Sequence, residues 1–428
     1  MKSKKSPKSK KWKISLLGSS IIVLGAAAGV GYSLYQRKAK NSQTNVSNDK
    51  TVYEQIKSYE LKTNHYRILH WNVLNFGGSK HVFNSFKVVG IAQILVSSNA
   101  TVMGLTEINN GDTKKVKLIV DAMNKIKPNT FDYIVQDPKE ATSSIYPKSK
   151  ESIAIIYDKN KVKPSKFKNG NIGESYKHNY KLQESNSVYK LSSENDEYVR
   201  PLFGIEFQII NSKSKTKFFT TFFGHLDSPS ASNNEYNISK GELKSPQKTY
   251  KINNVGSKEL QEVINLPEAF MFFKGISNSN NIIFGGDTNI NASAASSFDY
   301  IAEIGNLNNY YPASEAKKEK FLTSLTTVDS FKRNPKKYPY VNGYDKWIFS
   351  EDNLDFLDQK EDPDGYFKID IAKAFNNQLL NREEMKKRYI RDYQKSTNPD
   401  DKNPTDFRMI RIGLSDHAPI MIDFQAKK

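Results

Sequence analysis

The chain of 428 residues contains no cysteine. This absence excludes disulfide bonds, a disulfide-linked partner, thiolate metal ligands and a lipid anchor on cysteine, and it leaves the redox compartment open. Acidic residues are also absent from the first 40 positions. What the chain does have is a hydrophobic content of 37% and an aromatic content of 12%. These values are sufficient to bury a substantial core.

Positive charge is concentrated at the N-terminus. The net charge is +18, and residues 1–40 carry ten Lys and Arg residues. Without those ten residues, 54 basic and 46 acidic residues remain, which gives the rest of the chain a net charge of +8. This mild excess suits a polyanionic substrate without requiring one.

An uncharged segment of 22 residues, 14–35, follows a basic tail at 1–13. A membrane-spanning helix needs about 20 apolar residues. Seven lysines before the segment and three basic residues after it predict a signal anchor, with a cytoplasmic N-terminus and an extracellular domain held by the polar tether 36–62. The alternative is a signal peptide cleaved near Ala26–Ala28, which would release a secreted protein. The length of the apolar segment favours the uncleaved, single-pass anchor.

From residue 63 onward, strand patterns alternate with helix patterns. Strands are predicted at 65–76, 101–107, 131–136, 152–158, 202–210, 217–227, 281–287, 344–350 and 418–424. Helices are predicted at 83–98, 114–126, 257–276 and 379–393, and Pro267 is expected to bend or split the third. Many strands with few helices favour an α/β (α+β) domain with largely buried sheets. The polar stretches 160–197, 228–256 and 351–408 are interpreted as insertions.

The stretch NIIFGGDTNINA, residues 281–292, ends an apolar run with two glycines and then presents Asp287 and Asn289. Side chains alternate in extended backbone, so these two are expected to point the same way from the rim of a sheet. The alternative is a loop in which both side chains cap local backbone groups. Taken alone, the stretch favours the loop.

Other predicted strand ends carry polar side chains as well. The full set is Asn72, Glu107, Glu151, His225, Asp287, Asn289, Asp345, Asp416 and His417. Carboxylate and amide oxygens suit Mg²⁺ or Mn²⁺, and histidines move protons near neutral pH. Each residue alone is commonly a cap, a surface ion pair or a core histidine. Together they indicate a site for phosphodiester cleavage, whereas His70 and His81 are interpreted as structural or exposed.

The order and content of these motifs resemble the endonuclease/exonuclease/phosphatase superfamily, which includes the DNase I-type enzymes. The motifs are WNVLNFGG, GLTEINNGD, KESIAIIY, FFGHLD, GGDTN, GYDKW and LSDHAP. The resemblance covers residues 63–428 and is strongest to the membrane nucleases of mycoplasmas. It implies a DNase I-like catalytic domain, a four-layer α-β-β-α sandwich of two packed mixed sheets.

The resemblance also implies which residues hold a metal and which contact substrate. Glu107 would be the main Mg²⁺ ligand, with Asn72 beside it and Asp416 as a further ligand, and Mn²⁺ is an alternative ion. Pancreatic-type relatives have disulfides and structural calcium sites. A chain without cysteine cannot form those disulfides, and because of this departure from the pattern structural Ca²⁺ is in doubt. Asp227 is either an extra ligand or a turn residue. The implied substrate contacts are Arg200, Lys346 and Tyr344.

The implied catalytic groups are two histidine–carboxylate pairs and an Asp–Asn pair. The first two pairs flank the scissile phosphate, and the third holds the attacking water and the phosphate oxygens. These groups are His225 with Glu151, His417 with Asp345, and Asp287 with Asn289.

These observations lead to the hypothesis of a membrane-anchored, Mg²⁺-dependent nuclease that degrades extracellular DNA, or RNA, for nucleotide acquisition. Lys-rich insertions suit phosphate contacts rather than base readout, hence low sequence specificity. A sphingomyelinase and an inositol-polyphosphate phosphatase are alternatives on the same catalytic core. The first predicts an exposed aromatic-rich hairpin and the second a Trp-Cys-Asp-Arg motif, and neither is evident. A non-enzymatic binding protein would have lost motif residues, and none is missing.

Overall fold

The computed structural model describes residues 58–210, 216–228, 235–350, 354–356 and 367–426. The chain divides into two units, Met1–Glu54 and Gln55–Lys428, and every described element belongs to the second. The predicted tail, the predicted anchor and most of the predicted tether lie outside the described residues. Within the described ranges, no helix combines the length and apolar character needed to cross a bilayer.

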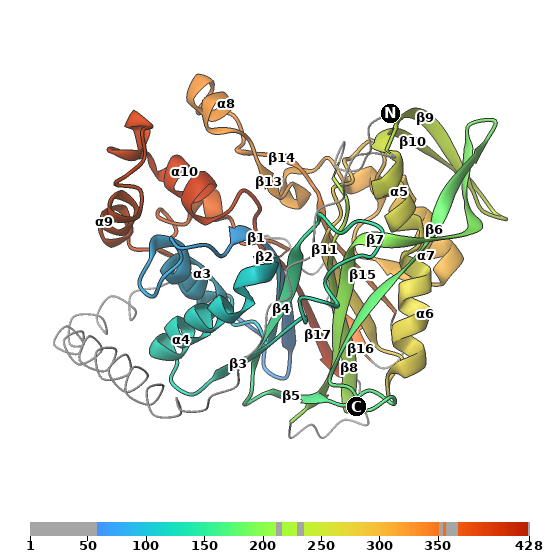
Figure 1. Ribbon diagram of the computed structural model, residues 1–428, viewed down its shortest axis with the longest axis horizontal. Coiled ribbons are helices and arrows are strands. Elements are labelled where there is room, and N and C mark those ends of the chain that lie inside the picture. The colour runs from blue at the N-terminus through green and yellow to red at the C-terminus, as the bar shows by residue number, and fades with distance from the viewer. Residues whose placement is uncertain (1–57, 211–215, 229–234, 351–353, 357–366, 427–428) are drawn as a thin grey trace, which may run out of the picture. The chain divides into compact units, whose positions relative to one another are not determined.

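Two β-sheets stand side by side in the second unit (Figure 1). Sheet 1 has six strands in the order β16-β17-β1-β2-β4-β3. These strands are β1 (Tyr66–Phe76), β2 (Val102–Asn109), β3 (Phe131–Val135), β4 (Glu151–Asp158), β16 (Leu354–Phe356) and β17 (Ile420–Ala426). Strands β1 and β2 are parallel and the other neighbours antiparallel, so the sheet is mixed.

Sheet 2 has nine strands, in the order β10-β9-β7-β8-β11-β15-β12 with β5 and β6 also paired to β7. The strands are β5 (Val162–Ser165), β6 (Gly173–Ser185), β7 (Val188–Ile209), β8 (Phe218–His225), β9 (Asn237–Lys244), β10 (Thr249–Gly256), β11 (Ile282–Asp287), β12 (Asn308–Asn309) and β15 (Asp345–Ser350). Strands β8 and β11 are parallel, whereas β15 is antiparallel to β11. This sheet is therefore mixed as well.

Helices cover the outer faces of both sheets (Figure 1). Helices α3 (Phe86–Ser97) and α4 (Val116–Ile126) lie on sheet 1, and α5 (Ser257–Ile264), α6 (Leu266–Ile276) and α7 (Ser296–Gly305) lie on sheet 2. Pro267 stands in the first turn of α6, where a missing N–H costs no hydrogen bond. The predicted helix 257–276 is therefore split into α5 and α6. Splitting was one of the two outcomes expected for Pro267, and bending was the other.

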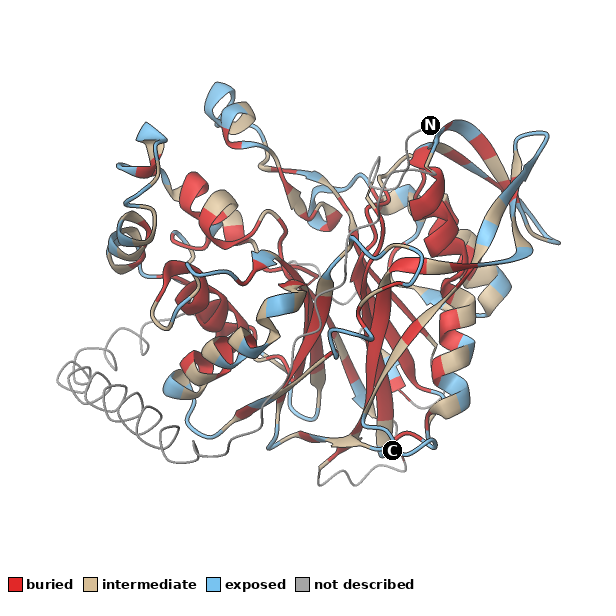
Figure 2. Ribbon diagram, viewed as in Figure 1, coloured by how far each residue is buried: buried red, intermediate tan, exposed pale blue. Residues whose placement is uncertain are grey.

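Three apolar clusters hold these layers together, and the sheet interiors are buried throughout (Figure 2). The cluster between the sheets includes Ile155, Phe223 and Trp347, and the other two lie between each sheet and its helices. Such burial contributes roughly 25 cal/mol per Å² of apolar surface. The predicted arrangement of two packed mixed sheets between helical layers is confirmed.

The polar stretches have more regular structure than the sequence suggested. Residues 160–197 form β5, β6 and the first part of β7, and residues 228–256 include the hairpin of β9 and β10. Strand β6 buries only two of its thirteen residues, so it lacks the apolar run by which buried strands are recognised. In the third stretch, α9 (Arg382–Asp392) forms where a helix was predicted.

The two sheets approach closely at Gly104 of β2, where a Cβ atom would lie 2.3 Å from Cδ1 of Phe223 on β8. Gly104→Ala is expected to lower the free energy of unfolding by about 1–3 kcal/mol, because the buried ring must shift. Gly111→Ala is the control, since its added Cβ would meet nothing within 4 Å. Urea denaturation of both variants measures the difference, and equal stability would contradict this inter-sheet contact.

Candidate active site

Three of the predicted site residues form a row across sheet 2. Strand β8 ends at His225, β11 ends at Asp287 and β15 begins at Asp345. The register pairs Asp287 with the other two, one on each side. Side chains of directly paired residues project from the same face of a sheet. The register therefore places an imidazole and two carboxylates together.

The double glycine before Asp287 explains how this row is packed. A Cβ at Gly285 would lie 2.3 Å from Cζ3 of Trp347, and a Cβ at Gly286 would lie 2.6 Å from the carbonyl oxygen of Gly224. Any larger residue would push the neighbouring strands apart. The glycines allow β8, β11 and β15 to stay in register up to the site.

Sheet 1 contributes Asn72 from β1 and Glu107 from β2. The Asn72 Nδ2 atom donates to Glu107 Oε1 at 2.8 Å and to Asp287 Oδ2 at 3.0 Å. The second bond connects sheet 1 to sheet 2. Its donor and acceptor are both about 99% buried, so water does not compete effectively for it.

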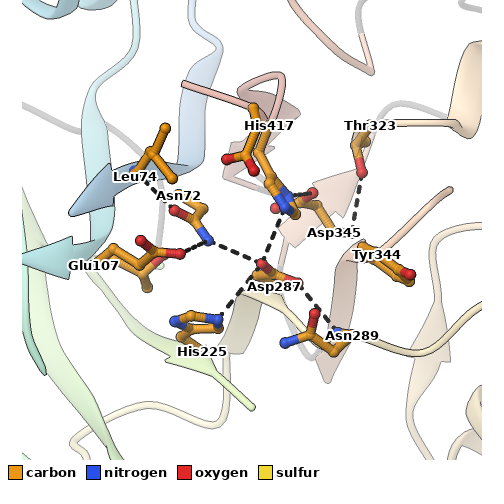
Figure 3. Close-up of polar contacts among 12 residues, drawn as sticks. Asn72, Leu74, Glu107, His225, Asp287, Asn289, Thr323, Tyr344, Asp345 and His417 are labelled. Atoms are coloured by element: carbon orange, nitrogen blue, oxygen red, sulfur yellow. Dashed lines mark hydrogen bonds and ion pairs between the residues drawn. The ribbon is translucent and has the colours of Figure 1, made fainter. Parts of the chain in front are cut away.

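Asp287 Oδ2 is the point on which the site converges (Figure 3). In addition to Asn72 Nδ2, His225 Nε2 lies 3.7 Å from this oxygen and His417 Nε2 lies 3.5 Å from it. Groups from both sheets and from the segment before β17 thus face one carboxylate oxygen.

Each histidine is oriented by a carboxylate at its other ring nitrogen. His225 Nδ1 is 2.7 Å from Glu151 Oε2, and His417 Nδ1 is 2.8 Å from Asp345 Oδ2. Holding Nδ1 in this way turns Nε2 toward Asp287. The structure therefore brings together both of the predicted histidine–carboxylate pairs.

The carboxylates favour the protonated imidazoles. Burial would lower the pKa of His417, but Asp287 and Asp345 raise it to about 10. Burial and Arg200 would lower the pKa of His225, but Glu151 and Asp287 raise it. Burial would raise the pKa of Glu151, yet His225 and Arg200 lower it to about 2. His417 is thus a cation at neutral pH.

Asn289 lies at the site, but its backbone conformation differs from the expected extended one. Its φ of +55° is left-handed, so residues 287–289 are not an extended segment. Its backbone N–H donates to Asp287 Oδ1 at 3.1 Å, and its side-chain Nδ2 donates to the carbonyl of Leu226 at 3.0 Å. The prediction that Asp287 and Asn289 alternate along an extended strand was wrong, and Asp287 caps a local N–H group as expected of a loop. Glu107 also has a left-handed φ, of +60°, and such strain is common at functional sites.

The predicted metal ligands fit a divalent cation only in part. Asn72 Oδ1 accepts from the N–H of Leu74 at 3.0 Å, which turns its amide nitrogen, not its oxygen, toward Glu107. This orientation does not match the predicted role of Asn72 as a ligand. Glu107 and Asp416 supply hard oxygens, and Asp416 Oδ1 is buried without a hydrogen-bond partner. In the described part of the chain, no three His, Asp or Glu side chains are already spaced to hold a metal ion.

Lys87 of α3 is a buried cation beside these carboxylates that the sequence did not single out. Its ammonium donates to the carbonyl of Leu74. Burial lowers its pKa to about 7, although Glu107 and Asp416 act in the opposite direction. A lysine near the start of a largely apolar helix is a signal that could have been noticed.

The three predicted substrate contacts have different surroundings. Arg200 Nε lies 3.1 Å from Glu151 Oε1, so this residue helps to position the His225 pair. The Tyr344 ring stacks on His417, with centroids 6.2 Å apart. Lys346 is not brought to the site: its ammonium is buried and donates to the Tyr311 hydroxyl. Neighbours in a strand face opposite sides, so Asp345 and Lys346 cannot both face the phosphate.

His70 lies behind the site and supports Asp345. It is fully buried, and its Nδ1 atom is 3.3 Å from Asp345 Oδ1. The structural interpretation of His70 therefore holds. Because His70 and Asn72 are two residues apart on β1, their side chains are on the same face of the strand, and this could have suggested that His70 contacts the site. His81 Nδ1 accepts from the N–H of Gly77 at 2.7 Å, which agrees with the structural interpretation of that residue.

A buried acidic cluster lies beyond Arg200. Asp227 is fully buried, and both its carboxylate oxygens lack a hydrogen-bond partner. Glu262 accepts the N–H groups of Val199 and Asp227, both at 2.6 Å. Burial raises the pKa of Glu262 to about 7, and burial together with Glu235, Asp227 and Glu262 raises that of Glu259 to about 8. Asp227 thus belongs to a group of carboxylates that tend to keep their protons.

This cluster predicts a dependence of stability on pH. Because the pKa of Glu259 rises from 4.5 to about 8 on folding, the native state keeps a proton that the unfolded chain loses, and stability falls as the pH rises from about 5 to about 8. Glu259→Gln keeps an acceptor for the N–H of Gly256. We expect its free energy of unfolding at pH 8 to exceed that of the wild type by on the order of 3 kcal/mol.

Urea denaturation at pH 5 and pH 8 measures this effect. The exposed Glu383→Gln variant is the control, for which we expect a change within about 0.5 kcal/mol at either pH. A Glu259→Gln variant with the same pH dependence as the wild type would show that Glu259 is ionised in the native state.

No protein-family model matches this chain, and no curated protein matches it. Solved structures are similar at a distance. An endonuclease/exonuclease/phosphatase family protein from Bacteroides thetaiotaomicron is 14% identical, with a TM-score of 0.41 over 84% of this chain and 97% of that one. The human Nocturnin catalytic domain is 12% identical, with a TM-score of 0.43 over 88% and 99%. A mannosyl-6-phosphatase from the same Bacteroides species is 14% identical, with a TM-score of 0.41 over 84% and 99%. Likenesses this distant do not assign an activity to the chain, so its function has to be argued from its own geometry.

Proposed function

We propose that this chain is a metal-dependent phosphodiesterase whose substrate is a nucleic acid. The observation that carries the proposal is the convergence of Asn72 Nδ2, His225 Nε2 and His417 Nε2 on Asp287 Oδ2. N–H donors fixed around one point, the positively charged imidazole of His417 among them, suit an anionic, tetrahedral phosphate, whose charge grows as it is attacked. The set also contains a carboxylate that can accept a proton.

The geometry supports a distinct role for each of these residues during hydrolysis. Asp287 takes a proton from the attacking water as the oxygen bonds to phosphorus. A protonated histidine gives its Nε2 proton to the leaving oxygen as the phosphorus–oxygen bond breaks. The second histidine and Asn72 donate hydrogen bonds to the remaining phosphate oxygens. Glu151 and Asp345 keep both rings oriented, in the manner of other histidine–carboxylate pairs.

Glu107 and Asp416 are the residues that would hold Mg²⁺ or Mn²⁺, and the ion would neutralise charge on the phosphate. Lys87 places its amine beside the same two carboxylates, with a pKa that burial lowers to about 7. In its protonated form it stabilises them when no metal is bound. Metal binding at this position is therefore expected to compete with the ammonium of Lys87.

The proposed substrate is DNA, and RNA is the alternative. The proposed role is the degradation of extracellular nucleic acid for nucleotide acquisition. Support for an outward-facing, membrane-held enzyme comes only from the uncharged segment 14–35 and its flanking basic residues. Phosphate contacts without base readout would give low sequence specificity.

Nicking of supercoiled plasmid by the purified full-length chain tests the proposed activity. We expect relaxation of the plasmid with Mg²⁺, none with EDTA, and rates reduced by about 10²–10⁴-fold in His225→Ala and Asp287→Ala, since each variant removes a proton-transfer group. His178→Ala, on β6, is the matched control and should keep wild-type activity. Degradation of linear DNA alone would indicate an exonuclease. If no nucleic acid is cut with either metal, the proposal is wrong, and sphingomyelin and inositol polyphosphates are the substrates to test next.

A further inference from the structure

A two-stranded projection, which contains β13 (Ser324–Leu325), α8 (Val328–Arg333) and β14 (Tyr340–Asn342), begins and ends close to residues of the candidate site (Figure 1). We call residues 324–342 the arm. Strands β13 and β14 pair with each other, and Ser324 forms an isolated bridge with His417.

Hydrogen bonds fix both ends of the arm to the site. The N–H of Leu325 donates to the carbonyl of Asp416 at 2.7 Å. On the return side the chain passes directly through Tyr344 into Asp345, whose N–H is 3.3 Å from Thr323 Oγ1. A ligand held by the arm would therefore have a defined position relative to His417.

The arm is strongly basic. It has one acidic residue, Asp329, and four basic residues, all exposed, which are Lys332, Arg333, Lys336 and Lys337. Lys332 is paired with Asp400, whereas the other three form no ion pair with the described residues. Unpaired cations so close together repel one another. Binding of an anion would relieve this repulsion.

A cavity of about 270 Å³ lies within the arm. Arg333 and Lys337 supply its positive charge, Ser330 and Asn334 supply uncharged donors, and Phe331 and Tyr338 supply aromatic surface. The Phe331 ring is held by stacking on Phe407, with centroids 3.9 Å apart, and the Tyr338 hydroxyl lies 2.9 Å from Lys368 Nζ. Most small-molecule pockets are about 300–1,000 Å³. The cavity is slightly smaller than this range, which suits part of a longer chain better than a separate small molecule.

We propose that the cavity of the arm is a second phosphate-binding subsite, which holds the backbone of a polynucleotide beyond the bond that is cleaved. This inference rests on the proposed function and makes its substrate class more specific. A nucleic acid carries a phosphate on every nucleotide, so one phosphate can occupy the catalytic centre while another, farther along the same strand, occupies the arm. Substrates with a single phosphate, such as a phosphocholine lipid, leave the arm without a ligand.

The test compares two substrates and two double variants of the full-length chain. Arg333→Gln/Lys337→Gln removes the two cations of the cavity. Lys163→Gln/Lys166→Gln removes two exposed charges at or beside β5, which lies at the opposite end of the sheets in Figure 1. The substrates are a 30-nucleotide single-stranded DNA and bis(p-nitrophenyl) phosphate, which has one phosphodiester and no polynucleotide backbone.

For the arm variant we expect KM on DNA to rise about tenfold. The dependence of this KM on salt concentration should weaken by the contribution of about one to two phosphate contacts. Its kcat/KM on bis(p-nitrophenyl) phosphate should stay within twofold of the wild type, and the β5 variant should match the wild type on both substrates. Equal losses on both substrates, or an unchanged KM on DNA, would overturn the subsite while the phosphodiesterase activity stands. If the wild type hydrolyses neither substrate, the proposed function itself fails and the subsite falls with it. Arm-dependent binding of anionic lipid vesicles but not of DNA would also contradict the proposal.

Discussion

The hydrogen bond between Asn72 and Asp287 is the interaction on which the rest of the site depends. It crosses from sheet 1 to sheet 2 at a buried point and ends on the carboxylate oxygen that His225 and His417 also face. Losing one partner of a buried, charged hydrogen bond leaves the other unsatisfied, at a cost of about 1–3 kcal/mol or more. This contact between the two sheets therefore serves both as a structural link and as the centre of the chemistry.

Electrostatic balance around Asp287 follows from this contact. Carboxylates at Glu151 and Asp345 hold the Nδ1 side of each histidine, so both Nε2 atoms face the same oxygen. The cost of burying these charges is offset only because each has an opposite charge within hydrogen-bonding distance. Lys87 lies beside the carboxylates of Glu107 and Asp416, and Arg200 pairs with Glu151. A site built in this way is already organised for an anionic ligand before one arrives.

Much of this arrangement could be predicted from the sequence, because buried strands leave clear apolar runs. The ends of β8, β11 and β15 were predicted to within two residues, and with them the row of His225, Asp287 and Asp345. Half-exposed strands such as β6 were missed, since their composition resembles that of a loop. Lys346 was expected to contact the phosphate from the family resemblance, whereas its buried ammonium donates to the Tyr311 hydroxyl. The left-handed backbone at Asn289 and the side-chain environments of His70 and Lys87 depend on contacts with segments distant in the sequence, which no single stretch encodes.

Titration of the His417 imidazole by ¹⁵N NMR, in the wild type and in Asp287→Asn, tests whether the site converges on Asp287. We expect a wild-type pKa well above the ordinary value of 6.5, near 10, because Asp287 and Asp345 both face this ring. In Asp287→Asn the pKa should fall by at least about one unit, since a nearby negative charge is lost. A His417 that titrates near its ordinary pKa in the wild type, or is insensitive to the substitution, would contradict the convergence of the site on Asp287.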